Sequence, residues 1–189
     1  ALVSKAWVEG FYSKPRVDFE LLEKYHEGLI ALSACLAGEI PRALSMRDYE
    51  EARKAALRYE GIFGKGNFYL ELQDHGLTEQ KAINPQLIRL SRETGIPLVS
   101  TNDCHYIRKE DSQMHKILLC IQTAKKLSDE DRMRYEGGQY YVKSEEEMKG
   151  LFPYAWEAVE NTQAIADRCN VEIEFGVTKL PHFEVPEGY

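Results

Sequence analysis

Short apolar segments alternate with amphipathic segments over the first hundred residues, and this alternation is the strongest constraint on the fold. The apolar segments are residues 28–33, 67–72 and 96–101. Between them, residues 48–63 and 83–94 carry apolar side chains at helical spacing, with charged side chains on the opposite face. The order strand, helix, strand, helix, strand is typical of a parallel sheet built from β/α units. We therefore predict an α/β fold.

The third apolar segment ends at a pair of residues that can carry chemistry. Asp103 and His105 stand two positions apart directly after it. Alternate residues of an extended chain point to the same side, so this carboxylate and imidazole can converge on one metal ion or phosphate. The ends of parallel strands are also where α/β folds place their sites. The pair alone leaves a second interpretation open, in which a strand-end aspartate caps a turn beside a surface histidine.

The alternation stops after Tyr106. Met114, Ile117, Leu118 and Ile121 indicate a helix, and the polar residues 123–138 indicate a loop. A short strand is predicted at 139–143, and two helices follow it. The alternating residues 171–175 predict a half-exposed strand.

Composition and charge exclude several classes of protein. The net charge of −7 over 189 residues argues against a domain that grips nucleic acid by itself, so any DNA would be held by other parts of a larger assembly. The sequence contains no run of about 18 apolar residues, so no membrane span is predicted. Four scattered cysteines without a Cys-x-x-Cys pair, and no signal-peptide pattern, predict a cytoplasmic protein. The chain starts at Ala1 rather than Met, from which we expect a fragment or a processed chain.

Four motifs carry a resemblance to a known family. They are Ser-Ala-Cys-Leu-Ala-Gly-Glu at 33–39, Phe-Tyr-Leu-Glu-Leu-Gln-Asp-His-Gly at 68–76, Ser-Thr-Asn-Asp-Cys-His-Tyr at 100–106 and Leu-Cys-Ile-Gln-Thr at 119–123. In this order they closely resemble the bacterial replicative DNA polymerase III alpha subunits. The region resembled is the second half of the N-terminal PHP (polymerase and histidinol phosphatase) domain and the segment leading toward the palm.

The resemblance implies a fold and a division of the chain. The PHP domain of this family is a distorted, seven-stranded β/α barrel, and residues 1–106 would be its C-terminal part. Residues 107–189 would be a mostly helical extension toward the palm. Three predicted strands are too few to close a barrel, so the resemblance implies that the remaining strands lie outside this chain.

The resemblance also implies a metal site. Three of the family's ligand positions fall on Cys35, Asp103 and His105, while the opening His-x-His pair would lie upstream of Ala1. Thiolate, carboxylate and imidazole are good zinc ligands, so zinc is the expected metal, with Mn or Mg as alternative metals. A cluster of such ions can activate water and hold a phosphate.

Several neighbouring residues have roles that the sequence leaves open. Glu71, His75 and Asn102 either support the strand-end loops around the metal or ligate it directly. Four basic residues occupy the polar loop, where they either face solvent or contact DNA or another polymerase domain; these are Lys125, Lys126, Arg132 and Arg134.

The implied parent is a DNA-directed DNA polymerase, a nucleotidyltransferase of DNA replication whose Mg-dependent palm site lies outside this chain. Its PHP domain would add a metal-dependent phosphoesterase of the 3′–5′ exonuclease type, and this segment alone would be inactive. The alternative is a non-catalytic PHP scaffold that stabilises the polymerase and docks the proofreading exonuclease subunit. The partners implied are DNA, that subunit and other replisome subunits, with no membrane. A free-standing enzyme resembling histidinol phosphatase is a third interpretation, against which residues 119–186 argue.

Overall fold

A three-stranded parallel sheet forms the centre of the molecule. The computed structural model describes residues 1–129, 135–178, 180 and 185. The sheet has the order β3-β4-β5, formed by β3 (Ala31–Leu32), β4 (Phe68–Leu72) and β5 (Leu98–Ser100). Its pairing is parallel throughout, with Leu32 opposite Tyr69 and Leu72 opposite Ser100. The predicted α/β class is therefore confirmed, whereas the described residues contain three strands of this sheet rather than a seven-stranded barrel.

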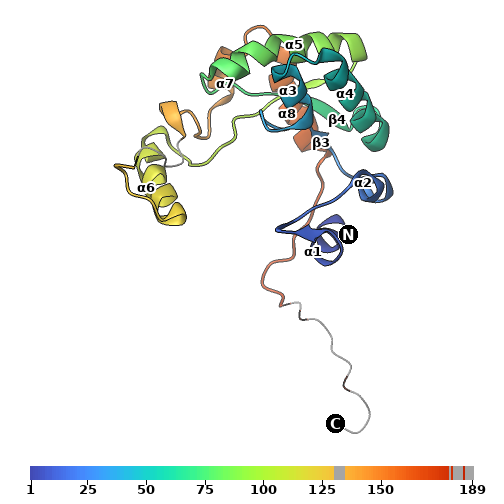
Figure 1. The fold of residues 1–189 in the computed structure, drawn as a ribbon, viewed down its shortest axis with the longest axis horizontal. Helices are drawn as coiled ribbons and strands as arrows, with labels where there is room; N and C mark the ends of the chain where they lie inside the picture. The colour runs from blue at the N-terminus through green and yellow to red at the C-terminus, as the bar shows by residue number, and fades with distance from the viewer. Residues whose placement is uncertain (130–134, 179, 181–184, 186–189) are drawn as a thin grey trace.

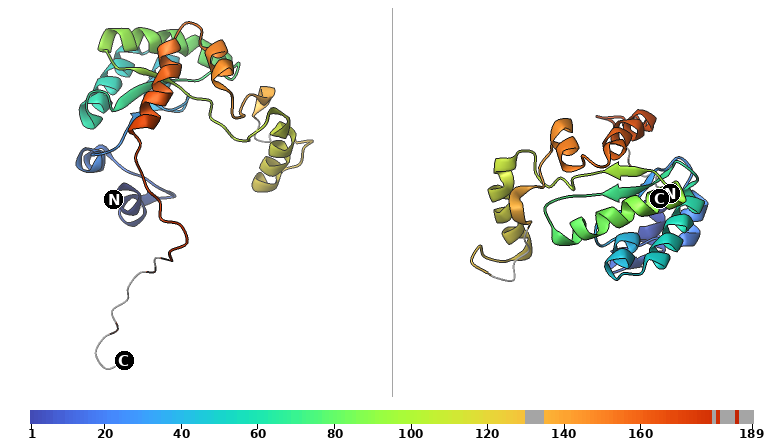
Figure 2. Two further views of the ribbon diagram at one scale, coloured as in Figure 1. Left: turned by 180° about the vertical axis from the view of Figure 1, so that it is seen from behind. Right: turned by 90° about the horizontal axis from the view of Figure 1, so that it is seen from above.

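Helices cover both faces of the sheet, as the view from above in Figure 2 shows. One face is covered by α3 (Glu39–Ser45), α4 (Tyr49–Phe63) and α5 (Thr78–Thr94). The other face is covered mainly by α8 (Trp156–Arg168), which packs along β5. All residues of β4 and β5 are buried because both faces are covered.

The ends of α4 follow from its sequence, whereas the start of α5 does not. Asp48 caps α4 by accepting a hydrogen bond from the Glu51 backbone N–H, and Gly64 ends it with a φ of 85°. The helix predicted at 83–94 begins earlier, at Thr78, and runs through Pro85. Asn84 is not an N-cap: its side chain is buried and donates to the Gln73 carbonyl oxygen at 3.1 Å.

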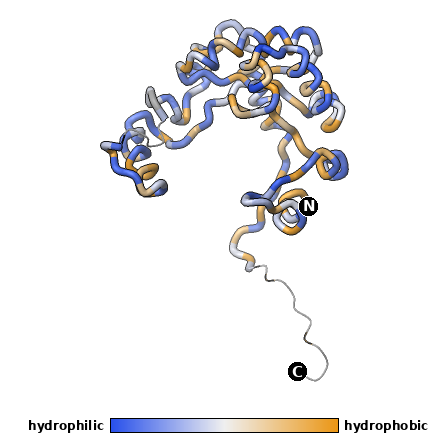
Figure 3. The backbone as a smooth tube through the Cα atoms, in the orientation of Figure 1, coloured by the Kyte–Doolittle hydropathy of each residue, from blue (hydrophilic) through white to orange (hydrophobic). Residues whose placement is uncertain are grey.

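The first 25 residues form a small unit outside the sheet (Figure 1). It consists of α1 (Leu2–Val8), a hairpin of β1 (Phe11–Tyr12) and β2 (Lys14–Pro15), and α2 (Phe19–Tyr25). Apolar stretches continue through this unit (Figure 3). Its aromatic side chains stack on each other but stay exposed to solvent, as the Trp7–Phe11 pair shows.

The chain after Tyr106 leaves the sheet and returns to it. The helix α6 (Ser112–Thr123) lies in a separate lobe (Figure 1), with the short helical turns η1 (Lys109–Asp111) and η2 (Glu136–Gly138) on either side of it in the sequence. The helix α7 (Glu145–Leu151) and α8 then rejoin the sheet. None of the described helices is long and apolar enough to cross a membrane.

One hydrophobic core contains residues from both sides of the predicted boundary at 106/107. Phe152, Ala155, Ala158 and Val159 belong to the same buried cluster as Leu70 and Leu98. The division into 1–106 and 107–189 stays a prediction. The prediction of a strand at 171–175 was wrong: these residues are exposed and pair with no strand among the residues that the structure describes, and alternation alone does not form a strand without a partner. In the predicted strand 139–143, Tyr141 forms a single parallel bridge with Tyr106.

Candidate metal-binding site

The carboxyl ends of the three strands meet at one edge of the sheet, where a buried glutamate ties them together. The Ser33 hydroxyl, after β3, accepts a hydrogen bond from the Glu71 backbone N–H at 2.8 Å. The Glu71 carboxylate accepts hydrogen bonds from the Gln73 amide, at 3.0 Å, and from the Thr101 hydroxyl, after β5. Glu71 thus fixes the relative positions of the strand ends.

His75 is buried and uses both ring nitrogens within the protein. Its Nε2 lies 2.9 Å from the Asn102 carbonyl oxygen, and its Nδ1 lies 2.9 Å from the Gln80 amide nitrogen. Because the first partner only accepts and the second donates, these contacts require a neutral ring protonated on Nε2. The ring also stacks on Tyr140, with centroids 4.1 Å apart. His75 therefore has no free nitrogen for a metal in this arrangement, which favours its supporting role over direct ligation.

Asp103 and His105 are brought together at the end of β5. The Oδ1 atom of Asp103 lies 3.3 Å from Nε2 of His105, and both side chains are partly exposed, at 44% and 29% respectively. The backbone of Asp103 is left-handed, with a φ of 43°. Such a conformation is unfavourable for most residues with a side chain and is often found at functional sites.

Cys35 lies at the same edge of the sheet, but after a different strand. It follows Ala34, which is also left-handed, with a φ of 65°. Cys35 and Glu71 help to line a small pocket of about 10 Å³, which is about the space that one water molecule requires. Because β4 separates β3 from β5, the two outer strands are about 10 Å apart. Cys35 is therefore placed across the width of one strand from the Asp103 loop.

The donor atoms present fit part of a metal site. Ligands of one tetrahedral zinc ion, each about 2.0–2.2 Å from it, lie about 3–4 Å from each other, and the 3.3 Å between Asp103 and His105 falls in that range. Across the residues that the structure describes, no three His, Cys, Asp or Glu side chains form a group that could hold a metal ion. Asp103 and His105 could therefore supply two donors to a site that needs further ones, and among the described residues Cys35 does not complete a three-donor group with them.

Aromatic side chains surround His105, and the sequence did not predict that they cluster there. The ring of Tyr135 lies 4.1 Å from that of His105, between centroids, and His115 lies 5.4 Å away. Burial and the nearby Asp103 carboxylate raise the pKa of Tyr140, which keeps its phenol protonated. Burial, followed by the neighbouring imidazole of His105, lowers the pKa of His115. The only sequence signal for this cluster was the aromatic pair in the segment 139–143.

Two of the four basic residues in the polar loop, Lys125 and Lys126, lie within the described residues. Lys126 is exposed, and its backbone N–H donates to Asp129 at 2.9 Å. Arg132 and Arg134 lie outside the described residues. A contact of this loop with DNA or another domain stays a prediction.

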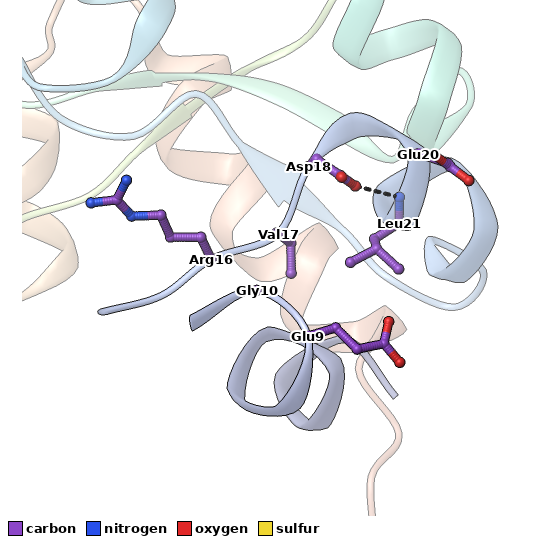
Figure 4. Close-up of a pocket in the computed structure, with 7 residues that line it drawn as sticks. All are labelled: Glu9, Gly10, Arg16, Val17, Asp18, Glu20 and Leu21. Atoms are coloured by element: carbon purple, nitrogen blue, oxygen red, sulfur yellow. Dashed lines mark hydrogen bonds between the residues drawn. The ribbon is translucent and has the colours of Figure 1, made fainter. Parts of the chain in front are cut away.

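A larger hollow of about 470 Å³ lies between α1 and α2, far along the chain from this site (Figure 4). Three carboxylates line it. Asp18 is engaged as the N-cap of α2, accepting a hydrogen bond from the Leu21 backbone N–H at 2.9 Å, and Glu9 pairs with Lys5. Glu20 is an exposed residue in the first turn of the same helix. These engagements give Asp18 and Glu9 structural roles.

Comparisons with known proteins show which family and which relatives the chain is similar to. Residues 1–75 match the family described as the PHP domain. The chain is 48% identical over 188 residues to DNA polymerase III subunit alpha of Treponema pallidum (strain Nichols), covering 100% of this chain and 16% of that protein. It is 45% identical to the same subunit of Borreliella burgdorferi and 44% identical to that of Thermus aquaticus, again covering 16% of each. The chain thus spans 16% of the length of these relatives. From end to end it matches one segment of DNA polymerase III subunit alpha, a segment in which residues 1–75 match the PHP domain.

Proposed function

We propose that this chain is a segment of a replicative DNA polymerase alpha subunit, in which it supplies part of a metal-dependent phosphoesterase site. The single observation that carries the proposal is the approach of Asp103 and His105 to 3.3 Å at a strand end. The similarity to DNA polymerase III alpha subunits along the whole chain supports the parent's identity. The parent would be a DNA-directed DNA polymerase, whose Mg-dependent palm site would lie outside these residues.

The proposed setting is a distorted, seven-stranded barrel. Strands β3 and β5 form the two edges of the described parallel sheet, so each has one side on which a further strand could pair. Such pairing would bring further ligands to the edge that carries Cys35, Asp103 and His105. Residues 1–106 would then belong to the barrel, and 107–189 would lead toward the palm.

In this proposal the protein side chains have distinct tasks. Asp103 and His105 would hold a divalent ion, zinc by the chemistry of the donors and otherwise Mn or Mg, with Cys35 as a donor to the same cluster. When bound, the metal supplies Lewis acidity and a water molecule of lowered pKa for phosphodiester hydrolysis. Glu71 and His75 fix the strand ends without touching the ion. The segment alone would hydrolyse little, since it holds only part of the ligand set.

The proposed partners follow from the proposed parent. They are DNA, held by the rest of the polymerase, the proofreading exonuclease subunit and other replisome subunits, in the cytoplasm. The net charge of −7 supports binding of DNA by other parts of the polymerase, since negative charge on this chain repels the phosphates of DNA.

The test uses the intact polypeptide that contains this chain, with Asp103→Ala and His105→Ala, singly and combined with Cys35→Ala. Bound metal is measured by elemental analysis and by Zn²⁺ titration, and 3′–5′ hydrolysis is measured on a single-stranded oligonucleotide. We expect each variant to lose metal and hydrolysis while polymerase activity persists. His26→Ala is the matched control, because His26 is the residue after the end of α2 and lies away from the strand ends. Unchanged metal content in Asp103→Ala and His105→Ala would contradict the proposal.

A scaffold role is the second candidate, and exposed apolar surface favours it. Leu118 and Ile121 on α6 are 61% and 72% exposed, more than a helix packed in its final setting should show. In the same experiment, a scaffold predicts that the wild-type protein hydrolyses no oligonucleotide. The metal-ligand variants would instead lower thermal stability or binding of the proofreading exonuclease subunit.

A further inference from the structure

Asn102, the residue before Asp103, is buried and makes an unusual number of hydrogen bonds. We propose that Asn102 is a positioning residue, which holds the loop with Asp103 and His105 against residues 139–143 and so keeps the two ligands together. This inference rests on the proposed function, and it makes the metal site depend on a segment beyond the predicted barrel boundary.

The side chain of Asn102 joins two segments almost forty residues apart. Its Nδ2 donates to the carbonyl oxygens of Gln139, at 2.9 Å, and Tyr141, at 2.7 Å. Its Oδ1 accepts a hydrogen bond from Nζ of Lys143 at 3.1 Å, and its backbone oxygen contacts Nε2 of His75. All polar groups of this side chain are therefore used, at an exposure of 7%.

The backbone continues the contact on the other side of Asp103. The His105 backbone N–H donates to the Tyr140 carbonyl oxygen at 2.8 Å, and Tyr106 bridges Tyr141 in parallel. The Val142 backbone N–H donates to Ile107 at 3.2 Å. Figure 1 shows the two segments side by side as they leave the sheet toward α6. Residues 102–107 thus lie against 139–142 along their length.

This arrangement accounts for the backbone of Asp103. A left-handed backbone is unfavourable for most residues with a Cβ atom and is adopted more readily by aspartate, and the surrounding structure holds it in place. Asn102 is anchored by its side chain and His105 by its backbone, so Asp103 is held from both sides. Releasing Asn102 would let Asp103 relax and turn its carboxylate away from His105.

The sharpest test is Asn102→Asp in the intact polypeptide. The change keeps the shape of the side chain but replaces the donating NH₂ by an oxygen, which then faces two carbonyl oxygens without a hydrogen. Asn161→Asp is the matched control: its Nδ2 donates to the Leu98 carbonyl oxygen of the same strand, at 2.7 Å, but away from the site. Zn²⁺ affinity, the visible spectrum of the Co²⁺ form and the thermal midpoint are measured for both.

We expect Asn102→Asp to weaken Zn²⁺ binding by about tenfold or more, as is typical of residues that orient metal ligands, and to alter the Co²⁺ spectrum. Asn161→Asp should leave Zn²⁺ affinity within about twofold of wild type. If the effect of Asn102→Asp came only from a disturbed β5, Asn161→Asp would lower Zn²⁺ affinity as well. Equal losses in the two variants, or unchanged affinity in Asn102→Asp, would overturn the inference.

Lys143→Met decides the matter if Asn102→Asp does not fold. It removes the hydrogen bonds from Nζ to Oδ1 of Asn102 and to the Gln139 carbonyl oxygen, but leaves both donated hydrogen bonds of Asn102 in place. We expect weaker Zn²⁺ binding with an unchanged thermal midpoint; unchanged binding would overturn the inference. Asp103→Ala distinguishes a failure of the proposed function from a failure of the proposed role of Asn102. If that variant binds Zn²⁺ as wild type does, the proposed function fails, whereas a loss there without a loss in Asn102→Asp or Lys143→Met refutes only the role of Asn102.

Discussion

Ala34, directly before Cys35, offers a test of the backbone geometry at the candidate site. Its φ of 65° lies in the left-handed region, and its side chain is exposed, so its methyl group contributes little to packing. A residue with a Cβ atom in this conformation places that atom too close to the following carbonyl oxygen. Replacing Ala34 by glycine should therefore stabilise the protein.

The magnitude follows from two opposing effects. The left-handed conformation costs an L-residue about 1–2 kcal/mol, which Ala34→Gly removes. Glycine in turn loses about 0.5–1 kcal/mol more backbone entropy on folding than alanine does. The expected net gain therefore lies between about 0 and 1.5 kcal/mol, with a central value of about 0.75 kcal/mol. For a chain of this size the central value raises the thermal midpoint by about 1.5–3 °C.

Ala164→Gly is the matched control, because the same chemical change should have the opposite sign there. Ala164 is an exposed residue inside α8, where glycine should destabilise by about 1 kcal/mol. Urea unfolding of both variants, followed by circular dichroism, measures the two free energies. If Ala34→Gly destabilised the protein as Ala164→Gly does, Ala34 would not be left-handed and the reasoning on strain at this strand end would be refuted.

Three further predictions concern packing and charge. Phe152→Ala should cost about 3–5 kcal/mol in urea unfolding, because Phe152 is fully buried in the shared core; a loss below about 1 kcal/mol would mean that α7 and α8 do not pack on the sheet. Burial and the hydrogen bond to Glu93 raise the pKa of Tyr49 to about 12, so Glu93→Gln should move its near-ultraviolet absorbance titration back toward 10.0, and an unmoved titration would refute the contact. Burial raises the pKa of Glu39, but hydrogen bonds, the first from Arg58, outweigh it and lower the pKa below 4.5. The stabilisation from Glu39 should therefore be complete above pH 4.5 and lost as the pH falls through the lower pKa of Glu39 in the folded protein. The difference in unfolding free energy between wild type and Glu39→Gln should shrink in acid, and a constant difference would contradict this.

Local features of the fold were predictable from the sequence because they depend on neighbours in the chain. The limits of α4 follow from Asp48 and Gly64, and the α/β alternation follows from the spacing of apolar residues. Asp103 and His105 could be paired in advance, since two residues of one loop that are two positions apart cannot lie far from each other. Their ligand roles and that of Cys35 stay predictions.

Other features required the tertiary structure, because their partners are far away in the sequence. The hydrogen bonds of Asn102 to residues 139–143 and the packing of α8 on β5 could not be predicted from local spacing. For the same reason, residues 171–175 alternate as a strand should but pair with no strand in the described part of the chain. The sequence by itself determined which segments could be helices and strands and that Asp103 and His105 lie together. Only the tertiary structure decided which distant segment holds the loop that carries them, because each buried polar group must find a partner wherever the folded chain supplies one.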